Sequence, residues 1–124
     1  MPHLTDPRAT YDLHGVTFRA FANGTTGATR LAAWRADFPP HSDGAAHSMT
    51  EEEVLHILSG SLEVEIDDDR FTARAGDAVL VLPGTRLRVS NTADRPASLW
   101  ATTVRGMRAQ MADDGARIAP PWAQ

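Results

Sequence analysis

The stretch from residue 47 to residue 60, HSMTEEEVLHILSG, holds the side chains best suited to chemistry. In an extended chain alternate residues share one face, so this stretch would aim an imidazole, a thioether and carboxylates into the same space. The residues on that face are His47, Met49, Glu51, Glu53, Leu55 and Ile57. Imidazole and carboxyl groups commonly transfer protons in enzymes. We therefore predict His47 and Glu53 as the catalytic residues of any acid–base chemistry.

The same stretch also carries the signals of an α-helix. Thr50 followed three residues later by Glu53 is a capping box, and Gly60 stands where a C-terminal glycine would end the helix. The next segment decides between the two structures, because polar and apolar residues alternate over 61–67 and lead into a turn. A β-hairpin at this place needs a neighbouring strand. We therefore predict that Glu53–Ser59 is a strand.

Further short segments with strand patterns give the whole chain an all-β character. Each is rich in apolar residues at alternate positions and is bounded by turn-forming residues. The segments are residues 30–38, 53–59, 61–67, 69–74, 78–82, 86–91 and 97–104, with a last one within 105–111. This spacing is typical of a β-sandwich or a β-barrel. A chain of 124 residues has room for a single domain, which we take as 1–124.

The chemically rich stretch resembles the first motif of the cupin family. That motif consists of a glycine, a His-x-His pair, a glutamate and a closing glycine. His47, Glu53 and Gly60 fall on it at the right spacing. His41 stands in place of the leading glycine, and Met49 stands in place of the second histidine.

A later stretch resembles the second cupin motif. The motif consists of a Gly-Asp pair, a short apolar strand, a turn with proline and glycine, a histidine and an asparagine. The matching residues are Gly76, Asp77, Gly84 and Asn91, with Pro83 displaced by one position. Leu87 stands where the histidine is expected. The resemblance covers about residues 30–105 and implies an RmlC-like jelly-roll barrel, the double-stranded β-helix of the cupins.

The resemblance also implies a metal site, but with half of its ligands replaced. Cupin enzymes hold Mn, Fe, Ni, Cu or Zn with three histidines and one glutamate. Only His47 and Glu53 remain here, because Met49 is a soft thioether and Leu87 has no lone pair. One alternative is a weakly held divalent ion such as Zn, Mn, Fe or Ni, completed by water, by a ligand or by His41. The other is a metal-free barrel in which His47 and Glu53 hydrogen-bond each other.

These alternatives lead to two functions. The first is a small-molecule-binding cupin with a degenerate metal site, whose enzymatic activity is left open. The second is a divalent-metal-dependent dioxygenase or isomerase with a reduced ligand set. For either function the expected ligand pocket contains mostly large apolar side chains: Trp34, Met49, Leu55, Leu87, Asn91 and Trp100. Such walls do not select a particular substrate.

The composition excludes other functions. Cysteine is absent, and all twelve basic residues are arginine, which rules out a Schiff-base lysine and a Walker-type phosphate loop. The net charge of −4 without a basic stripe argues against nucleic-acid binding. No apolar run approaches the roughly 18 residues of a membrane span, and no apolar signal region opens the chain. We therefore expect a cytoplasmic protein without membrane contact.

The sequence also predicts where the two ends of the chain and two further histidines lie. Residues 1–9 have no apolar pattern and are expected to be a flexible lead-in. Trp122 follows two prolines and is expected to dock onto the barrel or onto a partner subunit. Together with apolar N-terminal strands this predicts a homodimer. His14 is expected to cap a turn and His56 to face away from the barrel lumen.

Overall fold

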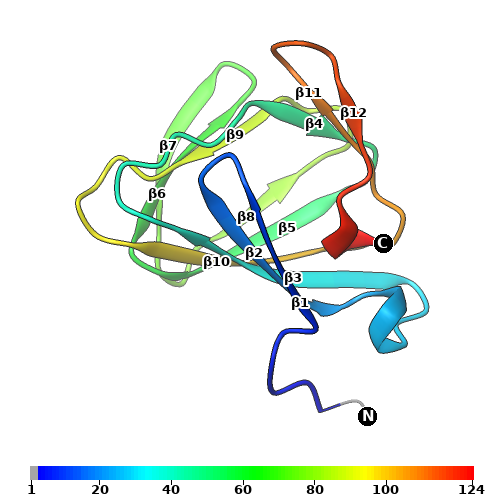
Figure 1. The fold of residues 1–124 in the computed structure, drawn as a ribbon. Helices are drawn as coiled ribbons and strands as arrows, with labels where there is room; N and C mark the ends of the chain where they lie inside the picture. Colours follow the sequence, from blue (N-terminus) through cyan, green and yellow to red (C-terminus); the bar gives the residue numbers. More distant parts are fainter. Residues whose placement is uncertain (1–2) are drawn as a thin grey trace.

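The computed structural model describes residues 3–124, which form two facing antiparallel sheets of six strands each (Figure 1). Residues 1 and 2, part of the expected lead-in, lie outside the described residues. Side chains from the inner faces of both sheets pack into one hydrophobic core. The prediction of an all-β jelly roll is confirmed.

The first sheet contains the N-terminal hairpin, the two strands that flank the motif region in the sequence, and one strand from each motif. Its strands, in spatial order, are β1 (Ala9–Leu13), β2 (Val16–Ala22), β3 (Leu31–Phe38), β10 (Ala97–Val104), β5 (Glu53–Ser59) and β8 (Ala78–Val81).

The second sheet faces the first across the core. Its strands, in spatial order, are β12 (Arg117–Ile118), β11 (Ala109–Met111), β4 (His47–Met49), β9 (Leu87–Ser90), β6 (Ser61–Ile66) and β7 (Asp69–Arg74). In the part of the chain that the structure describes, the helices are two 3-10 turns, η1 (Gly24–Thr26) and η2 (Pro121–Ala123). Within residues 3–124 there is no helix long and apolar enough to cross a membrane.

The segment Glu53–Ser59 is the strand β5, as predicted, and the helical interpretation is wrong. Its side chains alternate between a buried set, with Glu53 at its start, and an exposed set that includes His56. β5 hydrogen-bonds to β10 on one side and to β8 on the other. The capping signals of Thr50 are therefore outweighed by pairing on both edges and by burial of one face.

Gly60 makes the tight turn from β5 into β6. Its φ of +72° lies in the left-handed region that favours glycine. A Cβ at this position would stand 2.7 Å from the carbonyl oxygen of Pro96. This glycine of the first motif therefore serves the backbone, because its conformation allows the turn from β5 in the first sheet to β6 in the second.

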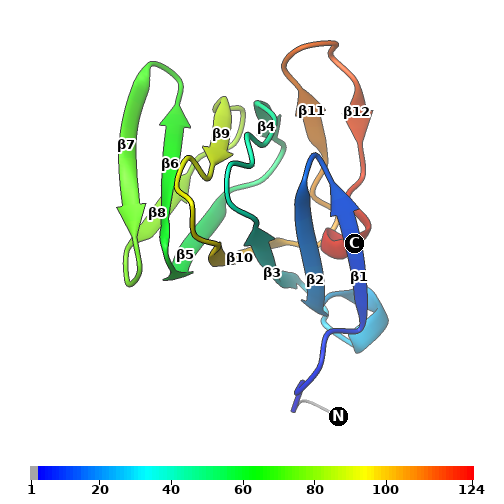
Figure 2. The same ribbon diagram turned by 60° about the vertical axis from the view of Figure 1, so that its left-hand side comes forward.

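Two hairpins extend the sheets beyond the expected core of residues 30–105. The β1–β2 hairpin adds to the first sheet and the β11–β12 hairpin adds to the second, on the side of the barrel away from β6 and β7 (Figure 2). β1 begins at Ala9, so the described part of the lead-in without strand structure is residues 3–8. Both hairpins reach the cavity described below.

The C-terminal segment docks onto its own barrel. Trp122 in η2 is buried and stacks on Phe18 of β2, with ring centroids 4.0 Å apart. Arg105 donates to the carbonyl oxygen of Gln124 at 3.0 Å, and the Gln124 side chain donates to that of Met107 at 2.9 Å. Of the two expected sites for Trp122, the barrel is therefore the one observed.

Candidate functional site

A cavity of about 100 Å³ lies between the two sheets. Its walls are mostly apolar and come from both sheets, from the β1–β2 turn and from the C-terminal segment. The exposed residue His14 lines it, so the cavity opens to the surface at that turn. The aromatic and methionine side chains that line it are Phe18, Trp34, Phe38, Trp122, Met49, Met107 and Met111. An apolar cavity with a few polar groups is the usual form of a ligand site.

Glu53 is the most unusual residue of the cavity wall. It opens β5, where the inward parity of the strand points its side chain between the sheets, and only 4% of the residue is exposed. Its Oε2 atom has no hydrogen-bond partner. Burial raises the pKa of Glu53 to about 8, because a charge is poorly solvated there. At neutral pH the side chain is therefore mainly an uncharged acid that can donate a hydrogen bond.

His47 lines the same cavity from the second sheet. Its Nδ1 lies 2.8 Å from the carbonyl oxygen of Ala45. A carbonyl oxygen only accepts, so Nδ1 carries the proton and Nε2 keeps its lone pair. Burial lowers the pKa of His47, the hydrogen bond to Ala45 opposes this shift, and nearby His14 reinforces it. A neutral imidazole with Nε2 free to accept is the result.

His47 and Glu53 line one cavity but do not hydrogen-bond each other. Glu53 Oε2 has no partner at all, and the hydrogen bond of the His47 ring goes to Ala45. The hydrogen bond between the two side chains that was expected for a metal-free barrel is therefore absent. Each of the two groups remains available to a bound molecule.

The positions of the two missing histidines are also at the cavity. Met49 lies on β4 two residues after His47, and Leu87 of β9 is the direct cross-strand partner of His47. Both are buried and line the cavity. The substitutions therefore leave the scaffold of the family site in place and fill two ligand positions with groups that do not suit a divalent ion.

The remaining donors do not fit a resident metal ion. Within residues 3–124 no group of three or more His, Cys, Asp or Glu side chains is placed to hold one. His41, which was one of three candidates to complete the ligand set, is exposed at a turn with φ of +57° and does not line the cavity. His47 and Glu53 supply two donors, whereas catalytic zinc usually has three protein ligands.

Two of the six expected pocket residues lie elsewhere. Trp34, Met49, Leu55 and Leu87 line the cavity as expected, but Asn91 and Trp100 do not. The Asn91 amide donates to the carbonyl oxygens of Phe38, Pro39 and Arg95 at 3.2, 3.2 and 2.7 Å. Asn91 thus ties two loops together.

Trp100 lies outside the cavity because of strand parity. On β10 the buried residue Leu99 faces inward, so the next residue faces the outer side of the sheet. There the Trp100 ring lies 5.2 Å from the ring of Phe21. His56 is its cross-strand neighbour and is exposed, as expected.

Sequence reasoning missed the parts of the cavity that come from the chain ends. Phe18, Met107 and Trp122 lie outside the two motifs and line the cavity. His14 was expected to cap a turn, and it does lie at the β1–β2 turn with φ of +51°, but it also lines the cavity mouth. The apolar alternation of β2 was the available signal for Phe18.

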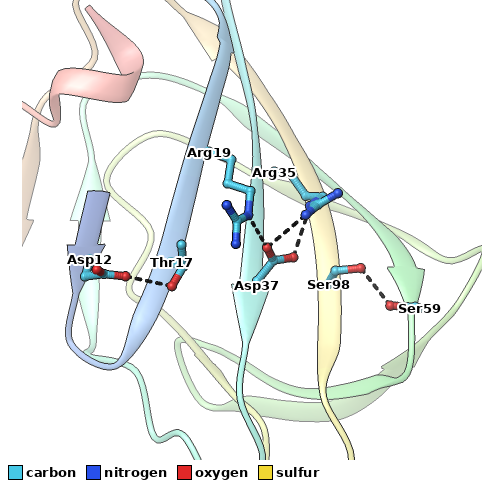
Figure 3. Close-up of polar contacts among 7 residues, drawn as sticks. All are labelled: Asp12, Thr17, Arg19, Arg35, Asp37, Ser59 and Ser98. Carbon is cyan, nitrogen blue, oxygen red and sulfur yellow. Dashed lines mark hydrogen bonds and ion pairs between the residues drawn. The ribbon is translucent and has the colours of Figure 1, made fainter. Parts of the chain in front are cut away.

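A separate polar cluster occupies the outer face of the first sheet. Arg19 donates to Asp37 at 2.6 Å, and Arg35 donates to the same carboxylate at 3.1 Å (Figure 3). Close by, Ser59 and Ser98 share a hydrogen bond of 2.7 Å. The two arginines are thus paired with a carboxylate and do not belong to the cavity wall.

These features define a class of protein: an antiparallel double-sheet barrel with an apolar cavity that carries one buried carboxyl group and one neutral imidazole. A family model described as the cupin domain matches residues 34–104, which is more than half of the chain. The chain therefore belongs to the cupin family. A search of curated proteins found no match.

Solved structures share the fold at low sequence identity. A sugar phosphate isomerase of the cupin superfamily from Silicibacter pomeroyi is 16% identical, with a TM-score of 0.75 over 94% of this chain and 85% of that one. The polyketide cyclase RemF from Streptomyces resistomycificus is 16% identical, with a TM-score of 0.74 over 84% and 78%. Salicylate 1,2-dioxygenase from Pseudoaminobacter salicylatoxidans is 15% identical, with a TM-score of 0.71 over 86% and 31%. At these identities the likeness shows the fold.

Proposed function

We propose that this cupin binds a small molecule in its barrel cavity, with Glu53 as the hydrogen-bond donor and His47 as the acceptor. The observation that carries the proposal is the buried Glu53 Oε2 atom without a partner. An unsatisfied buried polar group lowers stability by about 1–3 kcal/mol. Buried polar groups without partners are rare in folded proteins, and a bound ligand supplies the missing partner.

A second candidate function is proton transfer on the bound molecule. It is favoured by the pKa of Glu53, which is raised to about 8 and so lies close to neutral pH, where a general acid is most effective. The lone pair of His47 Nε2 would take a proton from the ligand while Glu53 gives one. Two proteins of similar fold are named as an isomerase and a cyclase, and rearrangements of that kind use proton transfers.

The metal-dependent dioxygenase or isomerase is the weaker alternative. One protein of similar fold is named as a dioxygenase. In this chain, however, Met49 and Leu87 occupy the positions of two ligands, and the two donors that remain are too few for a tightly held ion. We therefore assign the chemistry of the cavity to His47 and Glu53 themselves.

A fragment screen on wild type and on Glu53→Leu tests the binding function. Leucine has a similar size and no polar atom, so the free energy of unfolding should stay equal or rise, because an unsatisfied group is removed. Fragments that raise the melting temperature of wild type should lose this effect in Glu53→Leu. The matched control is Glu52→Leu, since Glu52 is exposed and lies one residue away. Hits that are equally effective in Glu53→Leu would refute the proposal.

A further inference from the structure

We infer that the ligand of this cavity is an uncharged aromatic molecule of one ring that carries a carbonyl or hydroxyl group. The inference rests on the proposed binding function and specifies its ligand class. It follows from three properties of the cavity: the absence of a cationic wall, the nature of the apolar side chains, and the hydrogen-bonding states of Glu53 and His47.

The charge of the wall disfavours anionic ligands. The titratable side chains that line the cavity are Glu53 from β5, His47 from β4 and His14 from the β1–β2 turn. Glu53 brings a negative charge when it ionises, and His47 is held neutral by burial. None of the arginines in residues 3–124 lines the cavity.

The two arginines on the outer face of the first sheet do not supply a positive charge to the cavity. Arg19 and Arg35 lie on the opposite side of the first sheet and are paired with Asp37 (Figure 3). A carboxylate or phosphate would thus lose its water shell in the cavity without gaining a counter-charge. The ligand class is therefore uncharged.

The apolar wall favours a flat ring. Phe18, Trp34 and Trp122 line the cavity, and the rings of Phe18 and Trp122 stack with an interplanar angle of 4°. Met49 and Met107 add polarisable sulfur atoms, which contact aromatic rings favourably. The cavity volume of about 100 Å³ is below the roughly 150 Å³ of an apolar cavity that holds benzene, so it limits the ligand to a single ring, part of which extends into the mouth at His14.

The two polar groups select the substituent. Protonated Glu53 donates, so it needs an acceptor on the ligand, which a carbonyl or hydroxyl oxygen provides. His47 Nε2 accepts, so it needs a donor on the ligand. A hydroxyl group gives it a full hydrogen bond, whereas an acidic C–H group next to a carbonyl gives only a weak one. An aryl carbonyl meets the minimum requirement, because it satisfies the buried carboxyl group.

The test uses three probes of similar size: acetophenone, benzoate and cyclohexyl methyl ketone. Benzoate replaces the methyl group of acetophenone by a charged oxygen, and cyclohexyl methyl ketone replaces its aromatic ring by a saturated one. Binding is followed by NMR through the indole N–H signals. Trp34 and Trp122 line the cavity, whereas Trp100 lies outside it and serves as an internal control. Each signal is assigned with the corresponding Trp→Phe variant.

At pH 7 acetophenone should shift the signals of Trp34 and Trp122 and leave that of Trp100 in place. Its Kd should be at least about tenfold lower than that of benzoate and about threefold lower than that of cyclohexyl methyl ketone. Above pH 8 its binding should weaken, because ionised Glu53 no longer donates. Glu53→Gln keeps a donor, so it should bind acetophenone at both pH values.

The outcomes separate this inference from the proposed function. Equal or tighter binding of benzoate or of the saturated ketone would overturn the inference and leave a binding cavity. The inference would also fall if none of the three probes bound while other fragments bound in a manner that depends on Glu53. If no fragment of any class depended on Glu53, both the inference and the proposed function would fall.

Discussion

Trp122, the third residue from the C-terminus, stacks on Phe18 of β2 with ring centroids 4.0 Å apart and an interplanar angle of 4°. The two residues are far apart in the sequence and both lie outside the two cupin motifs. The same indole also approaches Trp34, whose ring centroid is 6.5 Å away. The C-terminal segment therefore completes both the hydrophobic core and one wall of the cavity.

Trp122→Ala should lower the free energy of unfolding by about 3 kcal/mol, because it deletes a buried aromatic side chain and leaves a void. Urea unfolding followed by circular dichroism measures the change. Trp100→Ala is the matched control, since that indole is half-buried on the outer face and should have a smaller effect. Equal losses in the two variants would contradict the assigned role of Trp122.

The pKa of Glu53 predicts an unusual dependence of stability on pH. Its folded-state pKa is raised from 4.5 to about 8. Between these values the unfolded chain has released a proton that the folded chain retains, so the free energy of unfolding falls by about 1.4 kcal/mol per pH unit. The lowered pKa of His47 has the opposite effect, but only below its ordinary value of 6.5.

The test therefore covers pH 6.5 to 8. In this range the raised pKa of Glu53 changes the free energy of unfolding, and the lowered pKa of His47 does not. Wild type should lose about 2 kcal/mol of stability across it, whereas Glu53→Gln should stay nearly constant. Urea unfolding at several pH values gives the slopes, with Glu52→Gln as the control. A wild-type slope no steeper than that of Glu53→Gln would sink this prediction.

Much of the barrel could be predicted from the sequence because its signals are local. The alternation of polar and apolar residues in 61–67 was enough to reject the helix at Glu53–Ser59, although Gly60 also fitted the end of a helix. The motif spacing placed His47 and Glu53 in one lumen, but on one face of a single extended segment, whereas the structure places them on the two facing sheets. Such signals depend on neighbouring residues, which the sequence displays directly.

The remaining walls of the cavity could not be predicted, because they depend on packing between distant segments. Met107 and Trp122 reach the cavity only through the way the C-terminal segment folds back. For β10 the sequence predicted that Trp100 faces inward, whereas Leu99 does, and a shift of one residue exchanges the faces. For Asn91 no sequence signal distinguishes a ligand contact from hydrogen bonds to backbone carbonyls.

The outer face of the first sheet carries apolar side chains that a second copy of the chain would cover. Val54 of β5 and Leu80 of the edge strand β8 are direct cross-strand partners and are 41% and 56% exposed. Trp122, in contrast, is buried within its own barrel. We therefore propose that the homodimer predicted from the sequence forms through this face, which presents the same patch on both copies as a two-fold interface requires.

Light scattering tests this proposal with two variants. Wild type should have twice the 13.4 kDa mass of one chain at micromolar concentration. Leu80→Arg should give the single-chain mass, because two like charges would face each other across the interface. Phe71→Arg alters an exposed residue of β7 in the other sheet and should remain a dimer. A monomeric wild type, or dissociation by Phe71→Arg alone, would contradict the proposed face.

The donor set predicts that the wild-type protein holds divalent metal weakly. After dialysis, elemental analysis should find far less than one Mn, Fe, Ni, Cu or Zn ion per chain, and a chelator should leave the melting temperature nearly unchanged. A resident metal would add binding free energy to folding, so its removal would lower the melting temperature. Near-stoichiometric metal after dialysis would contradict the two-donor assignment.

The double variant Met49→His and Leu87→His should gain the ability to bind a divalent metal ion. Position 49 lies on β4 two residues after His47, and position 87 is the cross-strand partner of His47, so both new imidazoles would enter the cavity beside His47 and Glu53. Four donors of this kind suit Zn or Ni. Added metal should raise the melting temperature of the double variant, and the third variant Glu53→Gln on this background should reduce the rise. If Zn and Ni stabilise the double variant no more than wild type, then Met49 and Leu87 are not the residues that keep the cavity from holding metal.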